Sequence, residues 1–281
     1  MLLRRYVFSF SLVCVHATFL FVALVNRKAS DFRVVDADSI PVIDGKFAFD
    51  LYVDEVMPYD LISVEEFNHG SWYTCVFFAE EGVVDITFHH LDRDAKAPSL
   101  VSASPTNKRY LQYIAALQEM TDPLKYEADS LKKVGKWNTP RMMKLETEFR
   151  EAKDDQTKLK LAQEARVLSE SGEAFTPEYH AFQAKSKMVR EERDKYIEDF
   201  IRSDRTVIGL YLLRHKVLRN RDFSKELPLV ALFTEIYQPL FPNHPLSKQI
   251  EEWIQSLGIK VGNRYIDFTA PALDGTLHTL S

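Results

Sequence analysis

The sequence predicts an α+β protein: an N-terminal antiparallel β-sheet or sandwich, then a central helical hairpin with a small helical bundle, and finally a β-hairpin. Short apolar runs separated by turn residues fill roughly the first 105 residues, as is typical of antiparallel sheets. Beyond them, apolar residues recur every three or four positions, which indicates helices. We therefore divide the chain into a leader or membrane segment, a β domain, a helical region and a terminal hairpin, at residues 1–17, 18–105, 106–258 and 259–281.

Composition places the chain among ordinary globular proteins. Of the 281 residues, 46% are hydrophobic and 12% are aromatic, which is enough apolar surface to build a core. The net charge of -5 argues against nucleic acid as a partner, because phosphate binding needs clustered positive charge. The two cysteines, Cys14 and Cys75, form no Cys-x-x-Cys motif, so neither a disulfide framework nor a cysteine zinc site is expected.

The first segment is a long uncharged run that follows Arg4 and Arg5 and extends from Tyr6 to Val25. A basic start before an apolar stretch is typical of a secretory leader, and the run is also long enough to cross a bilayer as a helix. Its second part, Thr18–Val25, is rich in residues that favour strands. We expect a leader up to about residue 17 and a strand from Thr18 to Val25, with a membrane helix or strands throughout the run as the alternatives.

Turn signals divide the β domain into short strands. Asp44-Gly45 is a strong hairpin signal, and Phe47 and Phe49 after it alternate with small or polar residues. Residues Leu61–Glu66 alternate as a half-buried strand does. Two more strands are expected at Trp72–Phe78 and Val83–Phe88, and residues 96–105 are expected to form a loop.

Helices follow from residue 106 onward. Thr106 or Asn107 is expected to cap a helix that runs from Lys108 to about Met120. From Arg141 to Asp199 roughly two residues in five are charged, with acids and bases nearly balanced, which suits exposed helices. Three shorter helices that pack as a bundle are then expected at Thr206–Val217, Leu227–Gln238 and Leu246–Leu257.

Two apolar stripes and one break predict a long antiparallel helical hairpin within Arg141–Arg202. The stripes consist of Leu145, Phe149 and Ala152, and of Leu161, Ala165 and Leu168. Ser171-Gly172 interrupts the pattern, and Thr176-Pro177 restarts it as an N-cap followed by Pro at the first helical position. A basic run from Lys185 to Lys195 alternates with acids, so we expect a solvated helix face there and no anion site.

The final segment carries an ordered set of short motifs: Val261-Gly262, Asp267-Phe268, Ala270-Pro271, Asp274-Gly275 and Leu280-Ser281. This order resembles the start of a thioredoxin-like domain of the AhpC/TSA family. The resemblance implies a hairpin in which Phe268 and Leu273 point inward and Asp274-Gly275 forms the tight turn. Tyr265 and Ile266 depart from the family, which usually has Ala-Pro at this place.

The front half of the chain carries a second set of motifs: Asp36-Ala37, then Asp44 to Phe49, then Phe77 to Gly82, then Ser104 to Asn107 with Tyr110 and Tyr113. In this order they resemble an accessory domain of unknown function. That domain commonly precedes thioredoxin-like domains in envelope proteins of Gram-negative bacteria. With the helical region between the two sets, the resemblance covers most of the chain.

The resemblance implies the non-catalytic N-terminal portion of a thioredoxin-like thiol–disulfide oxidoreductase of the bacterial envelope, in the periplasm. The expected partners are its own downstream thioredoxin-like domain or other envelope proteins, with membrane attachment through the N-terminus as one alternative. No catalytic, cofactor-binding or metal-binding residue is assigned, and no cofactor is expected. The family's Trp-Cys-x-x-Cys motif is absent from the sequence, so we expect no activity from this chain. A stand-alone envelope module that binds proteins or serves a structural role is the second hypothesis, and the oligomeric state stays open.

Two further groups of residues invite a chemical interpretation. His89-His90 with Asp92 and Asp94 suggests a metal site, but neighbouring residues on a strand point to opposite faces, so a solvated strand end is the preferred interpretation. Cys75 lies in an apolar strand. We expect it to be a buried small hydrophobe, with a resolving thiol as the alternative.

Overall fold

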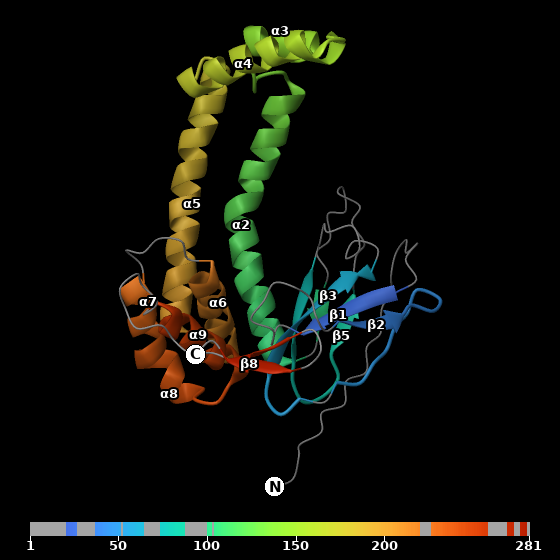
Figure 1. The fold of residues 1–281 in the computed structure, drawn as a ribbon, viewed down its shortest axis with the longest axis vertical. Coiled ribbons are helices and arrows are strands. Elements are labelled where there is room, and N and C mark those ends of the chain that lie inside the picture. The colour runs from blue at the N-terminus through green and yellow to red at the C-terminus, as the bar shows by residue number, and fades with distance from the viewer. Residues whose placement is uncertain are drawn as a thin grey trace. The chain divides into compact units, whose positions relative to one another are not determined.

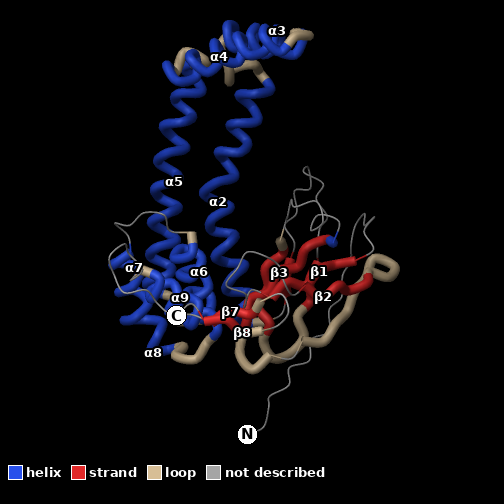
Figure 2. Tube along the Cα trace, viewed as in Figure 1, coloured by secondary structure: helices blue, strands red, loops and turns tan. Residues whose placement is uncertain are grey.

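The computed structural model describes residues 21–26, 37–51, 53–64, 74–87, 100–102, 104–219, 226–257, 269–272 and 276–279. Within them the protein is α+β, with more helix than strand (Figure 1 and Figure 2). The predicted leader at residues 1–17 lies outside the described residues, as do Cys14 and the His89-His90 pair with Asp92 and Asp94. No helix in the described part of the chain is both long enough and apolar enough to cross a membrane.

Four antiparallel strands form the main sheet, in the order β2-β1-β3-β4. They are β1 (Phe21–Asn26), β2 (Ala37–Pro41), β3 (Met57–Ser63) and β4 (Cys75–Ala79). A separate two-stranded sheet pairs β5 (Asp85–Thr87) with β6 (Leu100–Ser102). The strand predicted at Thr18–Val25 is confirmed from Phe21 onward, so the membrane-helix alternative is wrong for that part of the run.

The strands differ from the sequence prediction in two places. β3 lies between β1 and β4, and each of its residues is buried, so the half-buried pattern predicted for Leu61–Glu66 is wrong over its described strand residues. Alternate side chains of a strand point to opposite faces, and both faces of this central strand are therefore covered. The loop predicted for residues 96–105 contains β6, because three residues are too few to show a period in the sequence.

The turn predicted at Asp44-Gly45 is confirmed. Both residues have positive φ, 51° and 71°, which is the type I′ geometry that Asp-Gly favours. Ile43 and Lys46 close the turn with two backbone hydrogen bonds, of 2.8 and 2.9 Å. Phe47 and Phe49 follow outside the described strands, and their rings stack with 6.1 Å between centroids.

Eight α-helices, one π-helical segment and a last hairpin complete the described part of the chain. The first four are α2 (Pro105–Lys133), α3 (Pro140–Glu151), α4 (Asp155–Ser171) and α5 (Pro177–Ser203). The others are α6 (Val207–Leu218), α7 (Glu226–Leu232), α8 (Gln238–Leu240) and α9 (Pro245–Ser256), with the π-helical segment η2 (Phe233–Tyr237) between α7 and α8. The hairpin consists of β7 (Thr269–Pro271) and β8 (Leu277–Thr279). The three predicted bundle helices are confirmed as α6, the α7–η2–α8 run and α9.

α2 is much longer than the helix predicted from Lys108 to Met120. It begins at Pro105, so neither Thr106 nor Asn107 is its cap, and it continues through Pro123 to Lys133. α2 contacts α5 on both sides of this proline. Tyr113 stacks on Tyr196 at 6.0 Å, and Glu127 pairs with Lys185 at 2.5 Å.

The predicted helix break at Ser171-Gly172 is confirmed, but the predicted hairpin is only partly right. Gly172 ends α4 in the left-handed conformation, with φ of 82°, and the Thr176 hydroxyl accepts from Tyr179 N–H at 3.2 Å. The segment before the break is two helices, since Asp154 starts α4 by accepting from Thr157 N–H at 2.8 Å. The long helix beside α5 is therefore α2, and α3 and α4 lie between them in the sequence (Figure 1).

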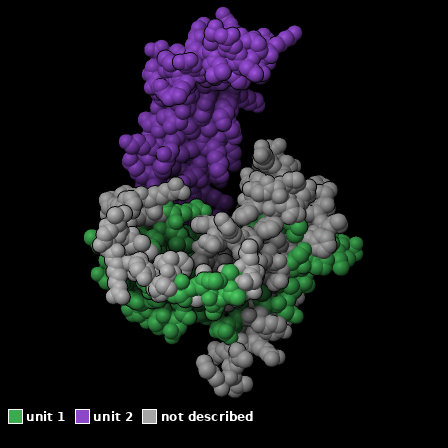
Figure 3. All heavy atoms as spheres, in the orientation of Figure 1, with its two compact units in different colours: residues 1–110, 200–281 green, residues 111–199 purple. Residues whose placement is uncertain are grey.

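The chain forms two compact units, one of residues 1–110 with 200–281 and one of residues 111–199 (Figure 3). We call them the sheet unit and the helical arm. This division differs from the boundaries drawn from the sequence at residues 105 and 258. Within the sheet unit, the Arg109 guanidinium lies 5.9 Å above the centroid of the Phe200 ring. The chain therefore leaves and re-enters the sheet unit at neighbouring positions.

Candidate functional site

Two of the motif segments in the front half, Phe77–Gly82 and Ser104–Asn107, meet in the structure. Asn107 is fully buried, and its side-chain amide pairs with the backbone of Phe78. Its Oδ1 accepts from Phe78 N–H at 2.8 Å, and its Nδ2 donates to Phe78 C=O at 2.7 Å. Because β4 is an edge strand of the main sheet, Asn107 takes hydrogen-bonding groups that would otherwise be open to another strand.

The same two segments make a second polar contact. Thr106 donates twice to the Glu80 carboxylate, from its N–H at 3.0 Å and from its hydroxyl at 2.7 Å. Glu80 thus places a negative charge at the N-terminus of α2, where backbone N–H groups attract it. Phe78 adds edge-to-face contacts with Tyr110 at 5.2 Å and with Tyr211 at 5.5 Å. We call the contacts of Asn107 with Phe78 and of Thr106 with Glu80 the strand–helix lock.

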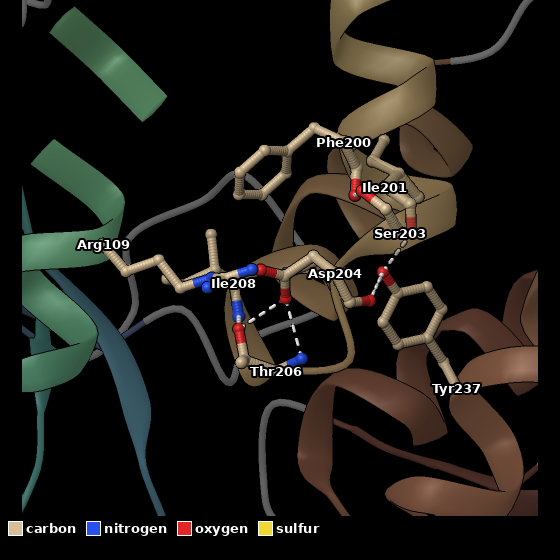
Figure 4. A network of polar contacts seen from close by, with 9 residues as sticks. Arg109, Phe200, Ile201, Ser203, Asp204, Thr206, Ile208 and Tyr237 are labelled. Carbon is tan, nitrogen blue, oxygen red and sulfur yellow. Dashed lines mark hydrogen bonds and ion pairs between the residues drawn. The ribbon is translucent and has the colours of Figure 1, made fainter. Parts of the chain in front are cut away.

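A buried carboxylate, Asp204, organises a second polar site at the end of α5 (Figure 4). Its Oδ1 accepts from Thr206 N–H at 2.7 Å, from the Thr206 hydroxyl at 2.5 Å and from Gly209 N–H at 3.3 Å. Its Oδ2 accepts from Arg109 Nε at 2.5 Å. Asp204 and Thr206 therefore cap α6, and Arg109 balances the buried charge with a side chain that is 51% exposed.

Tyr237, the last residue of η2, completes this polar site. It is fully buried, and its hydroxyl lies 2.5 Å from the carbonyl oxygen of Ile201 and 2.8 Å from that of Asp204. Burial, followed by the negative charge of Asp204, raises the pKa of the Tyr237 phenol far above its ordinary value. The phenol is therefore a protonated donor whose single O–H is shared between two carbonyls near the end of α5. Gly209 leaves the room for it, because a Cβ there would lie 2.0 Å from the Tyr237 hydroxyl oxygen.

His244 connects α9 to the segment before β3. It is 3% exposed and acts as the N-cap of α9, where its Nδ1 accepts from Leu246 N–H at 3.1 Å. Its Nε2 lies 3.0 Å from the carbonyl oxygen of Val56. Since Nδ1 is an acceptor, the hydrogen-bond pattern assigns the ring proton to Nε2, which donates to Val56.

These sites hold backbone groups in place. No set of three or more His, Cys, Asp or Glu side chains within the described ranges is placed to bind a metal ion. Cys75 is 5% exposed in the core of the sheet, as expected for a small hydrophobe. The basic run on α5 forms ion pairs, for example Lys187 with Glu191 and Lys195 with Asp199, which fits the predicted solvated face.

Sequence reasoning did not find the lock, the Asp204 site or the His244 cap. An Asp two positions before a Thr at a helix start is a local signal that could have identified Asp204 and Thr206 as a cap. The partners of Asn107, Tyr237 and His244 are distant in the sequence, and nothing local indicates them. No protein-family model matches the chain, and no curated protein and no solved structure is significantly similar to it.

Proposed function

We propose that the chain is the non-catalytic N-terminal portion of a thioredoxin-like thiol–disulfide oxidoreductase of the bacterial envelope, acting in the periplasm. In this role the sheet unit carries the start of the thioredoxin-like domain, and the redox chemistry belongs to cysteines outside this sequence. In such enzymes a thiolate of low pKa at a helix N-terminus attacks the substrate disulfide. The residues of this chain would position that domain.

The observation that carries the proposal is the hairpin of β7 and β8. Its strands pair antiparallel, and Ala272 N–H donates to the carbonyl of Thr276 at 2.7 Å. Leu277 is 72% exposed, and His278 and Thr279 are exposed as well, so both faces of β8 are open to solvent. A lone two-stranded hairpin is marginal in water unless a further strand or a helix covers it. A thioredoxin-like domain would supply both.

The strand–helix lock gives independent support. The resemblance to the accessory domain rests on motifs in separate parts of the sequence, and two of them contact each other through Asn107 and Phe78. Motifs that build one contact are expected to occur together and in a fixed order. Cys75 does not compete with the proposed downstream thiols, because thiol–disulfide exchange needs an accessible thiolate and Cys75 is 5% exposed.

The proposal is tested on the protein as its cells make it. The protein is captured from envelope extracts with an antibody against the sheet unit, and peptides are mapped by mass spectrometry with differential thiol alkylation. We expect peptides that continue past Ser281 and contain a Trp-Cys-x-x-Cys motif whose thiols react only after reduction. A mature C-terminal peptide that ends at Ser281 would contradict the proposal.

The chain of 281 residues by itself is expected to show no insulin-reducing activity, since it contains no Cys-x-x-Cys motif. The measurement is the turbidity assay with a chemical reductant, run on the wild-type chain and on a Cys14→Ala, Cys75→Ala double variant. Turnover above background in the double variant would show a reductase that needs neither thiol. We expect the turbidity to stay at background for both proteins.

The second candidate is a stand-alone envelope module that binds proteins. The observation in its favour is an apolar groove in the helical arm, between α3 and α4. Recovery of a mature protein that ends at Ser281 would favour this candidate over the first.

A further inference from the structure

The helical arm carries an open groove of about 640 Å³ between α3 and α4. Five apolar residues line it: Leu145, Phe149, Leu161, Ala162 and Ala165. Four of them, Leu145 and Phe149 on α3 and Leu161 and Ala165 on α4, belong to the two stripes that the sequence shows at helical spacing. Leu145 is buried at the base of the groove, and an ion pair between Arg141 and Glu164 joins the two helices.

The groove keeps a large apolar side chain exposed. Phe149 lines the groove, and 41% of its surface is exposed. An exposed aromatic ring in an apolar groove indicates a surface that another molecule covers.

The charges at the groove match those of the same groove on a second copy of the chain. The lining contains one acid and one base, Glu146 and Arg150, one helical turn apart on α3. Neither forms an ion pair with any residue that the structure describes: Glu146 accepts from Asn138 Nδ2 at 2.8 Å, and Arg150 Nε donates to the Glu146 backbone carbonyl at 3.4 Å. α3 has three acids and three bases, and so does α4, so neither helix carries a net charge that would repel a copy of itself.

We propose that this groove is the interface of a homodimer, in which α3 and α4 pack against the same helices of a second copy around a twofold axis. Antiparallel pairing of α3 with its copy places Glu146 opposite Arg150 of the second copy, and Arg150 opposite Glu146. Each ion pair then occurs twice, as an isologous interface requires. Phe149 of each copy covers the apolar lining of the other. This proposal does not depend on the redox proposal.

The test is the mass of the full chain by sedimentation equilibrium, from about 1 to 300 μM, a range that spans the dissociation constants of small interfaces. We expect the wild-type mass to rise from that of a monomer toward that of a dimer. Phe149→Glu places a charge in the groove and is expected to keep the chain monomeric. Val167→Glu is the matched control: it changes an apolar residue that is 59% exposed and lies outside the groove lining, and it should dimerise as the wild type does.

The charge pair gives the sharper test. Glu146→Arg alone and Arg150→Glu alone each put like charges opposite one another in a homodimer, which should weaken association at least about tenfold. An equimolar mixture of the two variants restores both ion pairs and should form a heterodimer. Circular dichroism verifies that each variant is folded, and the mixture remains decisive if Phe149→Glu does not fold. A monomeric wild type at the highest concentration would overturn the proposal and assign the groove to a different protein. A mixture that stays monomeric while the wild type dimerises would overturn it as well.

Discussion

Asn107 takes the place of a neighbouring strand for one residue of the sheet edge. Its amide matches the backbone of Phe78 with one acceptor and one donor, at 2.8 and 2.7 Å. Phe78 faces Pro58 across β3 and β4. Proline has no N–H to offer a ladder, and here that loss is harmless because the N–H and C=O of Phe78 turn toward α2 instead.

We predict that Asn107→Ala lowers the free energy of unfolding by about 3 kcal/mol, because a buried donor and a buried acceptor each lose a partner at about 1–3 kcal/mol. The measurement is urea unfolding followed by fluorescence. Asn138→Ala is the control, since the Asn138 amide binds Glu146 at an exposed position, and it should change stability by less than about 0.5 kcal/mol. Equal effects of the two variants would mean that the lock contributes nothing specific.

Gly209 and Tyr237 are expected to be energetically coupled. A Cβ at Gly209 would lie 2.0 Å from the Tyr237 hydroxyl oxygen, so Gly209→Ala should cost about 1–3 kcal/mol through overpacking. Tyr237→Phe removes that oxygen and should cost about 1 kcal/mol for the lost hydrogen bonding. In a double-mutant cycle the double variant should lose at least about 0.5 kcal/mol less than the sum of the single losses. Strict additivity would show that the two residues do not meet.

Tyr237 should also steepen the loss of stability in alkali. Burial raises its pKa in the folded protein above the ordinary value of 10.0, whereas the unfolded chain releases the proton near that value. The stabilisation is therefore fully present below about pH 10 and is lost as the pH rises above it, because only the unfolded state then ionises. Tyr237→Phe should show a shallower loss of stability between about pH 9 and 11 than Tyr126→Phe, which changes a tyrosine that is 67% exposed. If stability fell with pH equally steeply in both variants, the raised pKa of Tyr237 would be contradicted.

The sequence predicts the structural role of a single residue only where its partners are close to it in the chain. Asp44 and Gly45 are adjacent, and their turn follows from the two residue types alone. Asn107 fits a helix cap as well as it fits the sheet edge, and only the fold decides which of the two it takes. The burial of Tyr237 and His244 depends on partners that the sequence does not place nearby.

Elements of secondary structure depend on a balance between local preference and packing. Pro123 lies inside α2, where it removes a backbone hydrogen bond and crowds the preceding turn. The helix nevertheless continues, with Glu127 paired to Lys185 of α5 beyond the proline. The sequence predicted an end near Met120, and the helix continues beyond it to Lys133. The break at Gly172, by contrast, needs only a residue that accepts φ of 82°.

Pro123→Ala should stabilise the helical arm by about 1–3 kcal/mol, since it restores a hydrogen bond and relieves crowding in the helix interior. Pro140→Ala is the matched control, because Pro140 occupies the first turn of α3, where proline is tolerated. Thermal unfolding by circular dichroism compares the two variants. A melting temperature for Pro123→Ala that is at or below that of Pro140→Ala would show that α2 requires the proline.

The whole molecule is a sheet unit interrupted by a contiguous helical arm. Strand-like and helix-like halves were visible in the sequence, and this sufficed for the α+β class. The partition was not visible, because α6 to α9 have the same helical period as the arm yet belong to the unit that contains the sheet. What assigns them there is contact between segments far apart in the chain, such as Phe78 with Tyr211.

The hairpin of β7 and β8 should be the least protected strand pair of the described chain. Its exposed side chains bury little apolar surface, so its amides should exchange near the unprotected limit, whereas those of the buried strand β3 should persist. Hydrogen exchange read by mass spectrometry on the 281-residue chain measures both. Strong protection of Leu277 would show that the hairpin docks on this chain and needs no further domain.

The insertion of the arm also sets an order of events for a chain that is made from its N-terminus. Residues 111–199 form a contiguous unit and can complete their contacts while the rest of the chain is still being synthesised. The sheet unit cannot be completed until residues 200–281 arrive, because Tyr211 packs on Phe78 and His244 binds the Val56 carbonyl. These contacts join residues far apart in the sequence, and contacts of that kind form slowly. The return of α6 and α9 to the sheet is therefore expected to limit the folding rate, and until it occurs the nascent protein exposes the surface on which chaperones act.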